Sequence, residues 1–269
     1  MVIFLFNLDL IKIEATKIIH KENLKNNGYN KTYNLSKEER RSLELPPNKY
    51  FEQLWRLSMD PIEGRPLFEK LFELQEQLND SRKLREFTVP GESNATKWNE
   101  RGPNNVGGRT KGMMFDPNDS NDETIFTGGV TGGLFKNTNI SNPSSQWVKI
   151  EGIPENIPVS AITYDPNNPE IFYVATGESY TSDGPGNGVW KSADKGDSWT
   201  KIFGGRTGGY GKNGLIYIND IVVRNNSGTS EIFISSSPGY DGAAWVGINA
   251  YGVHKSTDGG ANFSKIEVK

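Results

Sequence analysis

The sequence predicts an all-β fold in which the same four-stranded unit recurs. Thirty glycines stand among the 269 residues, together with 6 Trp, 10 Tyr and 13 Phe. This balance is typical of aromatic-rich strands joined by tight turns. From about residue 98 the chain also repeats itself, and each copy holds four short β-type runs separated by turn residues. Repetition of four-stranded units predicts a partial β-propeller of about three blades, behind an N-terminal helical extension.

The repeat has three copies, and their aligned positions Phe115, Tyr164 and Val223 lie roughly fifty to sixty residues apart, as propeller blades do. The copies run over Gly112–Ile150, Ser160–Ile202 and Asp220–Ile266. Three blades do not close a ring, because propellers use about four or more. We therefore expect a fragment of a longer chain that lacks C-terminal blades or modules; completion of the ring by partner chains is the alternative.

Residues 36–95 are expected to form a helical leader and a linker, ahead of the propeller blades at residues 96–269. Ser36 and Glu39 have the spacing of a capping box. Apolar residues then recur at helical spacing over Tyr50–Leu57 and over Leu67–Leu78. We interpret these stripes as packing surfaces for a neighbouring domain.

Residues 1–35 are expected to be a flexible or targeting segment. The apolar run Val2–Leu8 is too short to span a bilayer, and no Lys or Arg precedes it. A weak signal peptide and an ordinary buried or disordered start both remain open. Lys21–Leu35 is polar without a period, which favours a flexible stretch.

The net charge and the lack of cysteine argue against several classes of partner and site. A net charge of -3 leaves no basic stripe for phosphate backbones, so we expect no nucleic-acid partner. Without cysteine there are no disulfides, thiolate metal sites or Cys nucleophile. We expect no cofactor and no metal site. The Asn- and Asp-rich turns Asp116–Asp122 and Asp165–Asn168 lack EF-hand spacing, and we interpret them as Asp-Pro turns rather than Ca²⁺ sites.

The pattern Ser-x-Asp-x-Gly-x-x-aromatic occurs between the third and fourth runs of two copies. The Asp can hydrogen-bond the turn backbone, the Gly allows positive φ, and the aromatic ring plugs the turn. Because the pattern recurs with the repeat, we assign it a structural role rather than a catalytic one. The first copy keeps only Trp147, with Asn137 and Asn139 in place of Ser and Asp. The full matches are Ser192, Asp194, Gly196 and Trp199, and Ser256, Asp258, Gly260 and Phe263.

These motifs resemble the Asp-box, or BNR, repeat of sialidases, sortilin-type receptors and xyloglucan-cleaving propeller hydrolases. The stretch from Trp98 to Trp199 is also similar to the opening blades of large secreted Bacteroidetes surface proteins. That similarity implies an extracellular or cell-surface location. The residues that carry it are Gly102-Pro103-Asn104, Gly107-Gly108-Arg109, Asp116-Pro117 and Gly132 to Lys136.

The resemblance leaves an enzyme as an alternative. Sialidases hold a substrate carboxylate with an arginine cluster, and their typical Arg-Ile-Pro motif is missing here. In xyloglucan-cleaving hydrolases a catalytic Asp typically stands two residues before the Gly-Gly of the first blade, where this chain has Val130. We therefore assign no catalytic residue, and a glycoside hydrolase fragment stays the alternative. A sorting receptor of the sortilin type is a third hypothesis.

The preferred hypothesis is a noncatalytic module that binds an extracellular glycan or a protein ligand. Three long insertions, Glu178–Asn187, Phe203–Asn219 and Ser236–Tyr251, are expected on one face of the propeller, opposite the Ser-x-Asp turns. Aromatic and polar side chains there suit sugars or peptides. Simple coverage of the blades is the alternative role for each of them. The candidates are Tyr180, Asp183, Arg206, Tyr210, Tyr240, Asp241 and Trp245.

Overall fold

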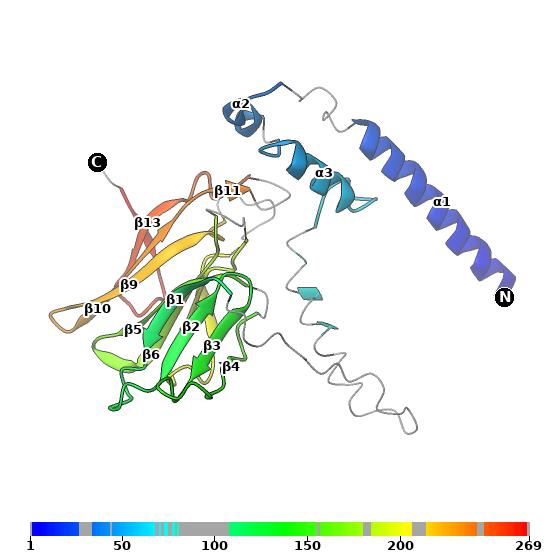
Figure 1. Ribbon diagram of the computed structural model, residues 1–269. Helices are drawn as coiled ribbons and strands as arrows, with labels where there is room; N and C mark the ends of the chain where they lie inside the picture. The colour runs from blue at the N-terminus through cyan, green and yellow to red at the C-terminus, as the bar shows by residue number, and fades with distance from the viewer. Residues whose placement is uncertain are drawn as a thin grey trace, which may run out of the picture.

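The computed structural model is mostly β, with helices at the N-terminal end (Figure 1). It describes residues 2–26, 34–43, 45–67, 70, 73–74, 77–78, 80, 108–154, 157–179, 184–205, 214–240 and 245–267, with only the backbone over 2–10. The linker expected before residue 96, the motifs Gly102-Pro103-Asn104 and Gly107, and half of the amphipathic run Leu67–Leu78 lie outside these residues.

Three antiparallel four-stranded sheets follow one another along the chain, and we call them blades 1, 2 and 3. Blade 1 contains β1 (Thr110–Phe115), β2 (Ile125–Gly129), β3 (Gly133–Asn137) and β4 (Val148–Lys149). Blade 2 contains β5 (Val159–Asp165), β6 (Asn168–Thr176), β7 (Val189–Ser192) and β8 (Thr200–Phe203). Blade 3 contains β9 (Ile218–Asn226), β10 (Thr229–Ser236), β13 (Gly252–Ser256) and β14 (Ser264–Ile266).

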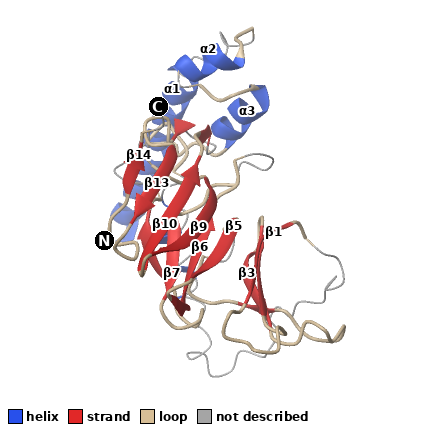
Figure 2. Cartoon of the chain, turned by 90° about the vertical axis from the view of Figure 1, so that its left-hand side faces the viewer, coloured by secondary structure: helices blue, strands red, loops and turns tan. Residues whose placement is uncertain are grey.

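The blades are arranged as in a propeller, with each first strand next to that of the following blade. β5 lies between β1 and β9 and contacts both, and Figure 2 shows the sheets side by side. Trp147, Trp199 and Phe263 each stand directly before the fourth strand of their blade. The prediction of an all-β partial propeller with aligned four-stranded copies is therefore confirmed.

Blades 1 and 2 share one hydrophobic core. Phe126 of β2 and Phe172 of β6 meet edge to face, with ring centroids 5.5 Å apart, and Trp199 completes the cluster. The strands approach so closely that a Cβ on Gly128 would lie 2.2 Å from Cγ1 of Val159. The clustered residues are Met114, Phe126, Leu134, Ile153, Ile157, Val159, Ile162, Phe172, Val174 and Trp199.

Blades 2 and 3 are joined in the same way. Phe203 and Phe263 stack with centroids 4.3 Å apart beside this second core. Its buried members are Tyr173, Ala175, Val189, Ile218, Ile221, Ile232 and Ile234. Most of the apolar burial therefore lies between neighbouring blades, so each blade depends on the next for its stability.

The N-terminal part forms three helices, α1 (Val2–Asn26), α2 (Lys37–Ser42) and α3 (Lys49–Leu57). The capping box forms as expected, since Glu39 N–H donates to Ser36 Oγ (3.2 Å) and Ser36 N–H donates to the Glu39 carboxylate (2.7 Å). None of the helices in the described residues is long and apolar enough to cross a membrane.

The expectation of a flexible stretch from Lys21 was wrong for Lys21–Asn26, which continue α1. Lys, Glu and Leu are good helix formers, so a helix extends through them without an apolar period. Asn23 is also held, because its Nδ2 donates to the carbonyl oxygen of Pro61 at 3.0 Å. The rest of Lys21–Leu35 is described only over Asn34 and Leu35.

Candidate functional site

Two candidate features stand at opposite ends of the strands, and the first is the pair of Ser-x-Asp turns. In blade 2, Asp194 accepts hydrogen bonds from Ser192 Oγ (2.7 Å), Ser198 N–H (2.9 Å) and Ser198 Oγ (2.5 Å). Gly196 N–H donates back to Ser192 Oγ (2.8 Å), and Gly196 has a φ of 92°. The carboxylate is thus fully occupied in closing its own turn.

The blade 3 turn repeats this geometry. Asp258 accepts from Ser256 Oγ (2.7 Å), from Asn262 N–H (2.9 Å) and from Asn262 Nδ2 (2.8 Å). Gly260 N–H donates to Ser256 Oγ at 3.0 Å, with a φ of 92°. The two aspartates therefore make the same kinds of hydrogen bonds at the same position of two blades.

The blade 1 turn is built from amides instead. Asn137 Oδ1 accepts from the N–H of Asn139 (2.8 Å), and its Nδ2 donates to Ser145 Oγ (2.8 Å). Asn137 thus takes over part of the bonding that a Ser and an Asp share in the other two blades. The turn is preserved although the motif has decayed.

The predicted ligand face is only partly described. Tyr180, Asp183, Arg206, Tyr210 and Asp241 lie outside the described residues. Tyr240 and Trp245 belong to a two-stranded insertion of β11 (Gly239–Tyr240) and β12 (Trp245–Val246), between β10 and β13. Both are buried, at 2% and 8% exposure, which differs from the open ligand face expected for them.

The leader helices cover this insertion. Trp245 Nε1 donates to the carbonyl oxygen of Leu45 (3.1 Å), and the Arg41 guanidinium lies 5.3 Å from the centroid of the Trp245 ring. Phe51 of α3 meets Tyr240 edge to face, with centroids 5.9 Å apart. These two aromatic residues therefore anchor the leader instead of offering a free sugar-binding surface.

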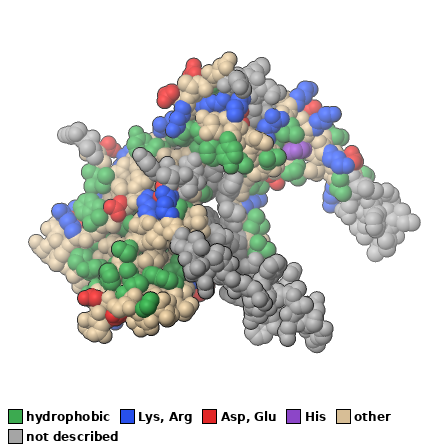
Figure 3. All heavy atoms as spheres, viewed as in Figure 1, with side chains coloured by type: hydrophobic (Ala, Val, Ile, Leu, Met, Phe, Trp, Pro, Cys, Tyr) green, Lys and Arg blue, Asp and Glu red, His purple; other side chains and the backbone are tan. Residues whose placement is uncertain are grey.

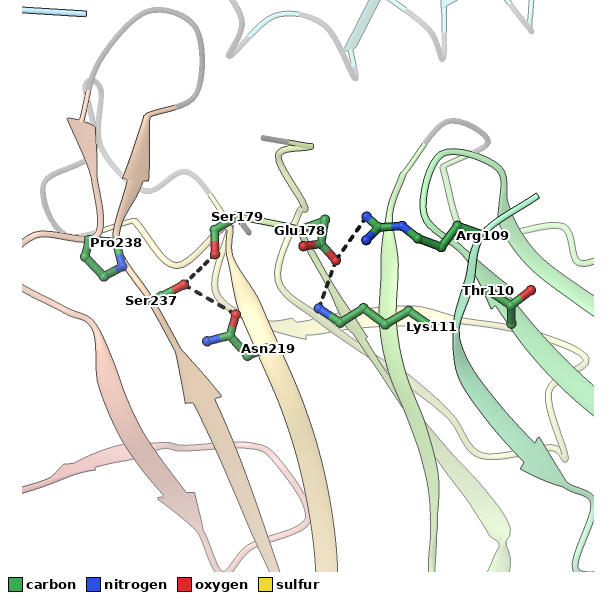
Figure 4. Close-up of a pocket in the computed structure, with 8 residues that line it drawn as sticks. All are labelled: Arg109, Thr110, Lys111, Glu178, Ser179, Asn219, Ser237 and Pro238. Atoms are coloured by element: carbon green, nitrogen blue, oxygen red, sulfur yellow. Dashed lines mark hydrogen bonds and ion pairs between the residues drawn. The ribbon is translucent and has the colours of Figure 1, made fainter. Parts of the chain in front are cut away.

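A polar cleft lies at the other end of the strands from the Ser-x-Asp turns (Figure 4). It is formed where β1 and β9 begin and where β6 and β10 end, so all three blades contribute to it. Its volume is about 710 Å³, within the size range of small-molecule sites. The lining residues that the structure describes are Arg109, Thr110, Lys111, Glu178, Ser179, Asn219, Ser237 and Pro238. This is the face on which the sequence placed the long insertions.

A bulge near the start of each first strand aims a polar side chain at this region. Pairing skips Lys111 in β1, Ser160 in β5 and Asn219 in β9, three positions that are equivalent in the repeat. Lys111 and Asn219 line the cleft, whereas Ser160 is buried and donates to the carbonyl oxygen of Ile218 at 2.5 Å. Bulges re-aim side chains in this way near functional sites.

Glu178 is the buried acidic group of the cleft. Its side chain is 3% exposed and makes ion pairs with Lys111 Nζ at 3.0 Å and with Arg109 Nη2 at 3.7 Å. Backbone bonds of 2.8 Å in both directions between Glu178 and Gly184 fix its position. A buried carboxylate needs such partners. Two cations around one carboxylate leave the group with a net positive charge, and the Arg109 side chain is half exposed.

A neutral polar cluster forms the other side of the cleft. The hydroxyls of Ser179 and Ser237 lie 2.7 Å apart, and Ser237 Oγ donates to Asn219 Oδ1 at 3.3 Å. The three side chains come from blades 2 and 3. Hydroxyl and amide groups exchange hydrogen bonds readily with hydroxylated or peptide ligands.

Sequence reasoning missed Lys111, Ser179, Asn219 and Ser237 as site residues. Glu178 was named only as the first residue of the insertion Glu178–Asn187, and Arg109 only as part of Gly107-Gly108-Arg109. The available clue was positional: Lys111 and Asn219 stand four residues before the aligned Phe115 and Val223. A bulge that turns these positions inward is a backbone feature, and residue types alone do not reveal it.

Neither a family model nor a curated protein matches the chain. Among solved structures, the chain is similar to the crystal structure of an ancestral GH74 enzyme, with a TM-score of 0.40 and 23% identity. The match covers 59% of this chain and 18% of the enzyme chain. A likeness of this size carries neither fold nor function, which rest on the sheets and contacts described above.

Proposed function

We propose that the chain is a noncatalytic ligand-binding or scaffold module of the Asp-box propeller type, from a secreted or cell-surface bacterial protein. The turns of Asp194 and Asp258, which bond identically at the same position of two blades, support the Asp-box assignment. The bacterial surface location rests on the resemblance of the sequence motifs. The ligand is an extended extracellular glycan or a protein segment.

The cleft is the proposed ligand site. The observation that carries it is the convergence of Arg109, Lys111 and Glu178 with a serine and asparagine cluster at the inner ends of three blades. The guanidinium offers several N–H donors in a fixed fork, and the hydroxyls add neutral partners. This mixture suits a ligand that carries hydroxyl and carboxylate or carbonyl oxygens.

The carboxylates of the cleft favour binding over hydrolysis. Glycoside hydrolases of both stereochemical classes commonly use two carboxyl groups on either side of the scissile bond. Glu178 is the sole carboxylate among the described lining residues. A buried carboxylate in a cleft is nevertheless a candidate catalytic group, and for this reason a glycoside hydrolase remains the alternative.

Binding and turnover can be measured on the same sample. We expect the full chain to bind members of a panel of acidic and neutral oligosaccharides and extended peptides in calorimetry, without new reducing ends or cleaved peptide. Arg109→Ala should weaken that binding by about tenfold or more, since a charge-assisted hydrogen bond contributes roughly 1.5 to 3 kcal/mol. Arg56→Ala, an exposed arginine on α3, is the matched control. Glycan cleavage that disappears in Glu178→Gln would instead identify a hydrolase.

A further inference from the structure

Each blade has two faces. We call the face on the side of the following blade its leading face, and the face on the side of the preceding blade its trailing face, whether or not a neighbour covers it. All three leading faces carry a lysine over an aromatic ring, within 5.1 to 5.7 Å of the centroid. Cross-strand registers place these pairs at equivalent positions. The pairs are Lys136 with Phe126, Lys191 with Tyr173 and Lys255 with Phe233.

In blades 1 and 2 the Ser-x-Asp turn of the following blade covers this pair. A Cβ on Gly196 would lie 3.0 Å from the Phe126 ring. One blade further on, Lys191 Nζ donates to the carbonyl oxygen of Gly259 at 2.9 Å. A leading face is therefore shaped to receive such a turn, with the ring for packing and the lysine for a turn carbonyl.

The leading face of blade 3 has the same parts but stays open. Val222 is 52% exposed, although the equivalent Met114 of blade 1 is buried in an interblade core. Lys255 Nζ bonds Glu231 of its own blade at 2.6 Å, and Phe233 lies between Lys255 and Arg224. This face holds the receiving half of an interblade contact.

The trailing face of blade 1 holds the inserting half. Trp147 is 46% exposed where the equivalent Trp199 is 8% exposed. Met113 is 62% exposed where the equivalent Ile162 and Ile221 are buried. Phe115 adds further exposed apolar surface, and Figure 3 shows hydrophobic side chains gathered over β1 to β3. Contiguous exposed apolar surface of this kind is typical of interaction sites.

We propose that these two faces bind each other between two copies of the chain. The trailing face of blade 1 in one copy packs on the leading face of blade 3 in the other, and the symmetric contact forms in return. The two contacts would join three blades from each copy into a closed ring of six, inside the range of about 4 to 8 that propellers use. Each contact would repeat the packing of the two interfaces within the chain, with the Asn137 turn of blade 1 in the place of a Ser-x-Asp turn.

Sedimentation velocity of the full chain over a range of concentrations tests the proposal, and a dimer is the expected species. Met113→Glu and Val222→Lys should each weaken dimerisation by about tenfold or more, because each buries one unpaired charge in both contacts. Both side chains are more than half exposed, so the fold should tolerate the changes, which thermal unfolding checks. Leu57→Glu, at 76% exposure on α3, is the control that should leave the dimer intact.

Mixing the two variants distinguishes the pairing of unlike faces from other association. A Met113→Glu copy with a Val222→Lys copy forms one native contact and one contact with opposite charges, so the mixture should recover dimers that neither variant forms alone. A monomer at all concentrations would overturn the proposal. So would a dimer that ignores both substitutions, as expected for pairing of strand edges, or loss of the dimer without recovery on mixing.

Discussion

At the scale of single residues, the hydrogen bonds of the Ser-x-Asp turns explain why the pKa values of their aspartates are lowered. The pKa of Asp194 is lowered to about 2 by Ser198, which donates through its hydroxyl and its N–H, and by the Ser192 hydroxyl. The pKa of Asp258 is lowered to about 2 by Asn262 and Ser256 in the same manner. Hydrogen bonds that favour the ionised form make the turns stronger when the aspartates are charged.

Because the folded pKa lies below the usual value of 3.8, these aspartates stabilise the fold above about pH 4 and lose that effect as the pH falls toward 2. Asp194→Ala should lower the thermal midpoint at pH 7 by about 2 to 4 °C, since Ser198 N–H loses its acceptor. Asp194→Asn, the side chain that blade 1 carries at Asn139, should lose less. Calorimetry from pH 7 to pH 2 checks both.

The same experiment can contradict the structural role. The difference in midpoint between wild type and Asp194→Ala should shrink as the pH falls from about 4 toward 2, because the carboxylate becomes protonated first in the unfolded chain and only near pH 2 in the fold. A difference that stays constant down to pH 2 would mean that the charge of Asp194 does not contribute to the turn. Loss of ligand binding with an unchanged midpoint would place Asp194 in a functional site instead.

At this scale the sequence predicted the turns well and the cleft poorly. A turn depends on residues that are close in the chain, so it can be predicted from the types and the spacing of Ser192, Asp194 and Gly196. The pairing of Lys111 with Glu178 joins residues 67 positions apart. It depends on a bulge and on the packing of two blades, neither of which follows from the residue types.

At the scale of elements, the leader is held together by a buried ion pair. Arg40 Nη1 lies 2.5 Å from Glu52 Oε1, and both side chains are 4% exposed. Arg40 also donates to the carbonyl oxygens of Leu35 (3.3 Å) and Pro46 (3.2 Å). These bonds connect α2 to α3 and so shape the surface that covers Trp245. The sequence predicted α3 and the capping box. Its apolar stripes did not indicate which surface they pack against, and Trp245 was assigned to the ligand face.

Arg40→Ala should release the leader without unfolding the blades. Arg40→Ala removes one of the two cations that pair with Glu52, because Lys49 Nζ also lies 2.7 Å from Glu52 Oε2. The cost should therefore stay below the roughly 3 to 5 kcal/mol of a buried charge that is left unpaired. Hydrogen exchange should therefore become faster in α2, α3 and β12 and remain unchanged in blade 1. Arg56→Ala, on the exposed side of α3, should change none of these rates. Unaltered exchange in β12 would show that the leader does not stabilise the insertion.

At the scale of the whole molecule, stability resides between the blades. Both large cores join residues from two neighbouring blades, and the strands of one blade contribute mainly backbone pairing to each other. The sequence predicted this architecture because repetition forces every blade to present the same two faces. What it did not show was which copies of those faces stay exposed, since exposure depends on the neighbours that a blade has.

Two tryptophans at the same repeat position measure this dependence. Trp199 lies in the core between blades 1 and 2, so Trp199→Ala should lower the free energy of unfolding by about 3 to 5 kcal/mol. Trp147 is 46% exposed, and Trp147→Ala should cost less than about 1 kcal/mol when the chain is dilute enough to be monomeric. Urea denaturation at low protein concentration measures both. Equal losses in the monomer would contradict the assignment, because they would require the trailing face of blade 1 to be as covered as that of blade 2.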